Sequence, residues 1–419
     1  MELDEHLFRR ESGRIVATLA RIFGMHNLAL AEDVAQDAFC RALEVWKFRG
    51  VPDNPSAWLM AAAKNRALDI LRRERTALTY APAFGRLFES EWTLAPVVEE
   101  QFGANMIKDS ELRMMFTCCH PKLPEEAQVA LILNILCGFS AGEIARAFLS
   151  TKAAIEKRIS RSKRILAGSK DLFEASDADF PARLTAVQRA LYLLFSEGYH
   201  GVSNERAVRA ELCKEAMRLT ALLSEHAPTA TPATYALAAL MCFDAARLPS
   251  RVDGDGNLSS LFGQDRSRWD GQLIAEGQAF LDLAATGTQM TEYHLEAAIA
   301  SAHSTAAHAD GTNWDRIVEM YDMLMTIRPS AIVELNRAVA IAQLNGPERG
   351  LEAVRAIRDQ DRLKSYPFYF AALGELESQS GRHVTALRHL QEAARLARNP
   401  MERRFFEQRI NESGRHSAE

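Results

Sequence analysis

The sequence predicts an all-α protein. Alanine and leucine dominate stretches of helix length, glycine or proline appears at helix-length intervals, and the alternation of β-branched residues that marks strands is absent. Residues 123–166 have the pattern of a helix-turn-helix. Near the C-terminus, helical hairpins recur at intervals of 34 and 35 residues.

The N-terminal part of the sequence predicts two amphipathic helices, over residues 3–23 and 31–46. The apolar stripe of the second helix is expected to be buried and comprises Ala35, Phe39, Ala42, Leu43 and Trp46. The opposite face is acidic and carries Asp33, Gln36, Asp37 and Glu44. Taken alone, this acidic face is typical of solvated surface.

Helix breakers at residues 48–55 predict a loop that leads into a basic helix over residues 55–75. Asn54 is suited to cap this helix, and Pro55 suits its first turn. Trp46 and Trp58 are assigned to the core rather than to base stacking. The helix displays Lys64, Asn65, Arg66, Asp69, Arg72, Arg73 and Arg75. Asn and Asp among cations can hydrogen-bond to bases, whereas cations alone would only hold phosphates.

The helix-turn-helix pattern has clear start and stop signals. Gly138 ends the first helix, Ser140 is placed to cap a short helix over residues 141–148, and Thr151 is placed to cap a long helix over residues 152–167. Ile155, Ile159 and Leu166 are expected to face the core, while six cations share the remaining surface with Glu156 alone. A helix that lies in the major groove needs cationic side chains on its flanks, because they neutralise the DNA phosphates. An ordinary solvated basic face is the alternative.

These motifs resemble a known family. Residues 31–39 (AEDVAQDAF), 54–59 (NPSAWL) and 67–73 (ALDILRR) look like a sigma-2 domain, and residues 123–166, with Glu143-Ile144-Ala145, look like a sigma-4 domain. Together they are similar to the extracytoplasmic-function (ECF) sigma factors of bacterial RNA polymerase. The motif over residues 116–121 and the long extension narrow the resemblance to the subgroup with a tetratricopeptide-type tail.

The resemblance implies three binding surfaces. The coiled coil of the polymerase β′ clamp would bind Asp33, Gln36, Asp37, Arg41 and Glu44. The −10 element, with a flipped base in the loop, would bind Val51, Asp53, Asn54, Lys64, Asn65, Asp69, Arg72 and Arg73. The −35 element would bind Thr151, Lys152, Lys157, Arg158 and Arg161. Because Lys152 is followed by two alanines, reading of this element is expected to depend on DNA shape and phosphates.

The same resemblance divides the chain into a sigma-2 domain (1–76), an acidic linker (77–109), a sigma-4 domain (110–170) and a helical extension (171–419). The linker is either a flexible tether or a segment threaded through the polymerase. Residues 1–170 carry 24 Lys and Arg against 21 Asp and Glu, whereas residues 171–419 carry 26 against 34. Basic stripes in an acidic body suit a factor that binds DNA within a larger assembly.

The extension predicts tetratricopeptide-like repeats around residues 298–400, with starts at Ala298, Ile332 and Pro367. In the middle repeat, packing positions fall on Leu335, Ala338 and Leu351. Such an array would bind a protein or peptide in its concave face. A plain helical bundle is the alternative.

Other motifs receive structural interpretations. Residues 251–257 suggest a calcium loop, but Leu258 and Gln264 replace the glycine and glutamate that it needs, so a tight turn is favoured. It leads into residues 265–270, which resemble a signature of the subgroup. The pair Cys118 and Cys119 lacks a fourth zinc ligand, which favours buried thiols. No cofactor, metal or enzymatic activity is expected.

The sequence shows no signal peptide and no long apolar span, so we expect a cytoplasmic protein, nucleoid-associated in holoenzyme, without a membrane partner. The resemblance implies a sigma factor that binds core polymerase through the β′ clamp and β flap, recognises −35 and −10 elements and helps to melt promoter DNA. The extension would control this activity in cis. The alternative is a tetratricopeptide scaffold or regulator that its helix-turn-helix tethers to DNA.

Overall fold

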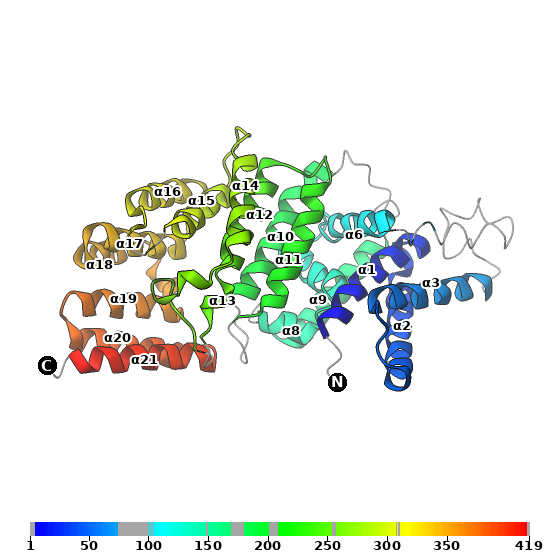
Figure 1. The fold of residues 1–419 in the computed structure, drawn as a ribbon, viewed down its shortest axis with the longest axis horizontal. Helices are drawn as coiled ribbons and strands as arrows, with labels where there is room; N and C mark the ends of the chain where they lie inside the picture. Colours follow the sequence, from blue (N-terminus) through cyan, green and yellow to red (C-terminus); the bar gives the residue numbers. More distant parts are fainter. Residues whose placement is uncertain are drawn as a thin grey trace. The chain divides into compact units, whose positions relative to one another are not determined.

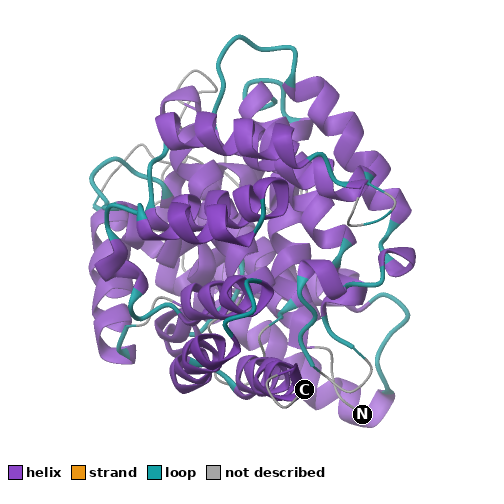
Figure 2. Cartoon of the chain, turned by 90° about the vertical axis from the view of Figure 1, so that its left-hand side faces the viewer, coloured by secondary structure: helices purple, strands orange, loops and turns teal. Residues whose placement is uncertain are grey.

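The computed structural model describes residues 5–73, 100, 102, 104–147, 150–168, 180–200, 208–253, 257–306, 308 and 311–416. Helices dominate this part of the chain, and its β structure is a single antiparallel bridge between Val252 and Leu258 (Figure 2). The predicted all-α class is therefore confirmed. None of the described helices combines the length and apolar composition needed to cross a bilayer.

Contacts divide the chain into two compact units. Unit 1 comprises residues 1–194 and 225–229, and unit 2 comprises residues 195–224 and 230–419. The division falls inside a helix, α10 (Phe180–His200), rather than at residue 170. The limits of the four domains expected from the sequence stay predictions, and the predicted linker lies almost entirely outside the described residues.

Unit 1 is built around helix α1 (Figure 1). This helix buries Ile15, Leu19 and Ile22 and packs against three helices as well as a π-helical turn over residues 132–136. The helices of unit 1 that precede α10 are α1 (Glu5–Phe23), α2 (Leu28–Arg49), α3 (Pro55–Arg73), α6 (Ala104–Cys118), α7 (Glu125–Leu131), α8 (Ala141–Ala147) and α9 (Lys152–Ala167).

Most helices of unit 2 pack against their neighbours in sequence. Its first helices are α11 (Ala210–Glu225), α12 (Pro232–Ala246), α13 (Leu248–Arg251) and α14 (Gly271–Ala284). They are followed by α15 (Glu292–Thr305), α16 (Trp314–Ile327), α17 (Ala331–Asn345), α18 (Pro347–Arg355), α19 (Pro367–Gln379), α20 (His383–Leu396) and α21 (Pro400–His416).

Helices α15 to α20 form successive hairpins in the region of the predicted repeats. Leu335, Ala338 and Leu351 are buried in one cluster that joins α17, α18 and α19. The first repeat start, Ala298, lies inside α15 and not at its beginning. The burial of these positions supports helical hairpins, whereas their assignment to the tetratricopeptide family stays a prediction.

The motif over residues 265–270 is part of the internal packing of unit 2. Arg266 lies over the Trp269 ring, 4.9 Å from its centroid, and donates a hydrogen bond to the His303 carbonyl at 2.9 Å. In the preceding turn, Asp253 accepts a hydrogen bond from the Asn257 backbone at 2.8 Å, although residues 254–256 lie outside the described part.

A glycine permits a close backbone approach inside unit 1. A Cβ atom at Gly13 of α1 would lie 2.0 Å from the carbonyl oxygen of Leu136 in the π-helical turn. Leu136 is fully buried, so the neighbouring backbone has little freedom to retreat. The contact therefore requires a residue without a side chain.

We expect Gly13→Ala to destabilise unit 1 by about 1–3 kcal/mol, because it places a methyl group inside occupied space. The measurement is the chemical denaturation midpoint of the full chain. Gly414→Ala is the control, because Gly414 also lies in a helix and its Cβ would meet nothing within 4 Å. Equal midpoints for the two variants would contradict the packing described at Gly13.

Candidate nucleic-acid and protein interfaces

The acidic face of α2 is exposed as the sequence predicts. Asp33, Gln36, Asp37, Arg41 and Glu44 all lie at the surface, opposite the buried face of the helix. Asp37 is not a lone charge, because Arg66 of α3 donates to it at 3.0 Å.

One residue of the predicted apolar stripe of α2 is placed differently. Leu43 is 48% exposed, so its assignment to the buried face was wrong. Leu43 directly precedes Glu44, and Trp46 takes the next buried position on this helix. An apolar side chain therefore lies beside the acidic surface, which suits a protein contact.

The conformation of the loop between α2 and α3 is fixed at both of its ends. Gly50 ends α2 with a φ of +80°, a backbone angle that residues with a side chain rarely adopt. At the other end, the Asn54 side-chain oxygen accepts a hydrogen bond from the backbone N–H of Ala57 at 3.0 Å, which confirms Asn54 as the cap. Between these ends, Val51 and Asp53 are exposed.

A buried carboxylate that sequence reasoning missed fixes the start of α3. Glu11 of α1 has no exposed surface, and it accepts hydrogen bonds from Ser56 of α3 at 3.0 Å and from Arg14 at 3.0 Å. Its charge also lies near the positive N-terminal end of α3. Glu11 looks like an ordinary helix-surface residue in the sequence, so no local signal could have identified it.

Helix α3 carries most of the predicted −10 residues. Asn65 and Asp69 are exposed and Lys64 is half-buried, whereas the side chains of Arg72 and Arg73 lie outside the described part.

The two tryptophans predicted for the core pack against each other. Trp46 and Trp58 have ring centroids 5.5 Å apart, and Trp46 is 2% exposed. Trp46 therefore belongs to the core as predicted, and Trp58, which is half-buried, packs against it.

The helix-turn-helix is capped at both of its short connections. Ser140 and Glu143 form a capping box: the Ser140 N–H donates to Glu143 at 2.9 Å, and the Glu143 N–H donates to Ser140 Oγ at 3.3 Å. Thr151 accepts a hydrogen bond from the Ala154 N–H at 3.2 Å and caps α9. These caps confirm the predicted starts of α8 and α9.

Helix α9 presents a basic surface over an apolar underside. Ile155, Ile159 and Leu166 are buried as predicted. Thr151, Lys152, Lys157 and Arg161 are exposed, and Arg158 is half-buried.

Ion pairs distinguish the cations of this basic surface. Lys152 lies 3.6 Å from Glu156, and Arg158 lies 2.9 Å from Glu126. Lys157 and Arg161 make no ion pair with any described residue, so their charges are available to a ligand.

Two ion pairs inside unit 1 join α1 and α2 to the helices α8 and α9 of the helix-turn-helix. Arg9 of α1 donates to Glu143 of α8 at 2.6 Å, and Lys163 of α9 donates to Glu32 of α2 at 2.5 Å. Burial alone would raise the pKa of Glu143, but hydrogen bonds from Ser140 and the charge of Arg9 hold that pKa below its usual value. Glu143 is therefore ionised at neutral pH and strengthens the contact with α1.

The cysteine pair is part of the core. Cys118 and Cys119 are buried, and burial raises the pKa of the Cys118 thiol to about 12. The thiols are therefore neutral, as the buried-thiol interpretation expects. The described residues contain no group of three or more His, Cys, Asp or Glu side chains that could hold a metal ion.

Known families match three parts of the chain. Sigma-70 region 2 matches residues 7–77, sigma-70 region 4 matches residues 113–166, and a family of unknown function, DUF6596, matches residues 183–285. An uncharacterised protein of Rhizobium meliloti (strain 1021) is 37% identical over 399 residues, which span 94% of this chain and 92% of that protein. No solved structure matches the chain.

Regions 2 and 4 followed by a helical extension define the architecture of an ECF-type sigma factor, a class that recognises promoters and is not enzymatic. The chain belongs to the same family as the Rhizobium protein, to which it is similar over almost its whole length.

The helix cap formed by Asn54 can be tested by substitution. We expect Asn54→Ala to destabilise the protein by about 1 kcal/mol, because the Ala57 N–H loses its acceptor. Asn54→Asp retains a good cap and should leave the midpoint of chemical denaturation unchanged. If both variants unfold at the wild-type midpoint, the cap makes no measurable contribution to stability.

Proposed function

We propose that this chain is a sigma factor that binds core RNA polymerase through the acidic face of α2, contacts the −10 element through the α2–α3 loop and α3, and contacts the −35 element through α9. The observation that carries the proposal is the occurrence of two differently built surfaces in one chain: a capped helix-turn-helix with a basic last helix, and an acidic helix followed by an exposed loop. Its place of action would be the bacterial cytoplasm.

The loop has the properties that capture of an extruded base needs. Val51 offers an exposed apolar side chain, and Asp53 and Asn54 offer exposed polar groups beside it. Extruding a base costs a few kcal/mol, which contacts made only with the extruded base can offset. The capped start of α3 and the buried Glu11 would hold the loop in place while the DNA opens.

The basic surface of α9 suits contact with phosphates more than contact with bases. Ala153 and Ala154 follow Lys152 at the exposed start of the helix, where base-reading side chains would stand. The unpaired Lys157 and Arg161 would neutralise phosphates, and sequence preference would come from DNA shape.

The proposed core-binding surface can be tested by charge reversal. Asp33 is exposed and makes no ion pair with any described residue, so Asp33→Lys should leave the fold intact. We expect at least a tenfold loss of affinity for core polymerase, measured by the fluorescence anisotropy of the labelled protein. Glu319→Lys is the control, since Glu319 of α16 is also exposed and lies in the extension.

A transcription assay with purified core separates this proposal from the alternative of a DNA-tethered scaffold. Core-dependent initiation at one start site supports the sigma factor. Specific DNA binding without core, together with unchanged core affinity in Asp33→Lys, would support the scaffold.

We further propose that the extension controls sigma activity in cis, with its repeats forming a tetratricopeptide-like array that binds a protein partner. Within unit 1, the first helix of the extension packs against the region 4 segment: the rings of Phe180 and Phe116 stack at 4.3 Å. Arg189 of α10 also pairs with Glu125 of α7 at 3.0 Å. A change in the extension thus has a direct physical connection to the helix-turn-helix.

Removing that connection should alter promoter output. We expect Phe180→Ala in the full chain to change transcription in vitro at least threefold, in the same direction as truncation after Lys170, because both expose Phe116. Phe405→Ala in α21 is the matched control. Wild-type output from both Phe180→Ala and the truncated chain would remove the proposed control by the extension.

A further inference from the structure

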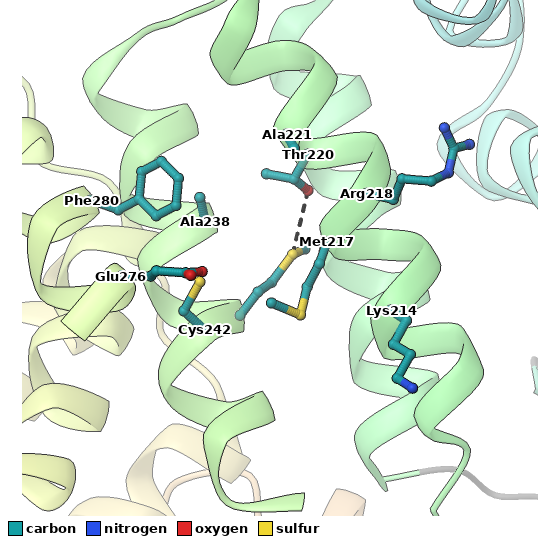
Figure 3. Close-up of a pocket in the computed structure, with 10 residues that line it drawn as sticks. Lys214, Met217, Arg218, Thr220, Ala221, Ala238, Cys242, Glu276 and Phe280 are labelled. Carbon is teal, nitrogen blue, oxygen red and sulfur yellow. Dashed lines mark hydrogen bonds between the residues drawn. The ribbon is translucent and has the colours of Figure 1, made fainter. Parts of the chain in front are cut away.

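Unit 2 contains a pocket of about 390 Å³ between α11, α12 and α14 (Figure 3). Thr220, Met241 and Cys242 line it and are almost completely buried, and Met217 and Phe280 contribute half-buried apolar surface. Sites for small molecules typically enclose roughly 300–1,000 Å³ and are mostly apolar with few polar groups. The pocket lies inside the matched segment 183–285, whose family has no known function.

The charge that faces this pocket is negative. Figure 3 shows the carboxylate of Glu276 turned toward Cys242. Glu276 accepts a hydrogen bond from Gln272 at 2.9 Å and has no cationic partner among the described residues. Its negative charge is therefore uncompensated beside an apolar interior.

The two cations that line the pocket do not neutralise Glu276. Arg218 pairs with Glu215 at 2.8 Å, and Figure 3 shows its guanidinium directed away from the pocket. Lys214 is exposed at the edge of the pocket, and neither cation lies within ion-pair distance of Glu276. An anionic ligand would thus meet Glu276 without gaining a buried cation.

The floor of the pocket adds no charge of its own. Burial, together with the negative charge of Glu276, raises the pKa of the Cys242 thiol to about 12, so the thiol stays neutral. The Thr220 hydroxyl donates a hydrogen bond to the Ala216 carbonyl at 2.8 Å and lies 3.4 Å from the Met241 sulfur, so it is already used inside the protein. Apart from Lys214 at the exposed edge, the polar group left for a ligand in this pocket is the carboxylate of Glu276.

We propose that this pocket binds small hydrophobic amines in their protonated form. The apolar body of such a ligand would pack against Met217, Met241 and Phe280, and its ammonium group would pair with Glu276. Methionine side chains adapt to ligands of different shape, and an aromatic ring attracts a cation over its face. The proposal concerns the extension alone and does not depend on promoter binding.

Three probes with the same phenylethyl body test the class of ligand: phenethylamine as the cation, 2-phenylethanol as the neutral analogue and 3-phenylpropionate as the anion. Each is titrated at neutral pH and constant ionic strength into the full chain labelled with 13C at the methionine methyl groups. We expect phenethylamine to bind at least tenfold more tightly than the other two and to shift the resonances of Met217 and Met241. Met217→Leu and Met241→Leu assign those resonances.

Variants separate the charge from the cavity. Glu276 is exposed, so Glu276→Gln should fold normally and reduce the affinity for phenethylamine to that for 2-phenylethanol, whereas Glu319→Gln should have no effect. Ala221→Trp at the exposed edge should block all three probes. Equal affinity for the three probes, a preference for 3-phenylpropionate that Lys214→Gln abolishes, or unshifted methionine resonances would each overturn the proposal.

Discussion

A buried charge network centred on Glu11 determines how the two promoter-binding regions are held. Glu11 is completely buried, and an isolated carboxylate in that position would cost several kcal/mol. Arg14 compensates it at 3.0 Å and also lies 3.8 Å from Glu111 of α6, another buried carboxylate. The Arg14 guanidinium thus joins α1 to α6, and Glu11, which also accepts a hydrogen bond from Ser56, extends this link to α3.

Gly13, which directly precedes Arg14 on α1, explains why this charge network holds regions 2 and 4 in one unit. Gly13 lets the helix approach the π-helical turn of region 4 until backbone meets backbone, and Gly138, with a φ of +67°, lies against Arg9 in the same way. Such contacts exclude water and fill space at the density of a protein core. Regions 2 and 4 therefore share α1 as a common core helix in the free protein.

The sequence correctly predicted the structural features that depend on residues close together in the chain. Asn54, Ser140 and Thr151 cap helices where the sequence places them, because a cap depends on neighbours within three residues. Leu43 was misassigned, since helical spacing alone does not show how wide the buried face of α2 is. Glu11 and Gly13 could not be identified, because their partners, Ser56 and Leu136, are distant in sequence.

The contacts between regions 2 and 4 indicate what opposes their separation. The side chains of the pairs Arg9–Glu143 and Lys163–Glu32 keep 15–34% of their surface exposed, so salt weakens these ion pairs in part. The apolar packing of α1 and the stacking of Phe180 on Phe116 are not screened. Opening of unit 1 therefore exposes apolar surface as well as breaking these ion pairs, and a partner that opens it has to cover that surface in exchange.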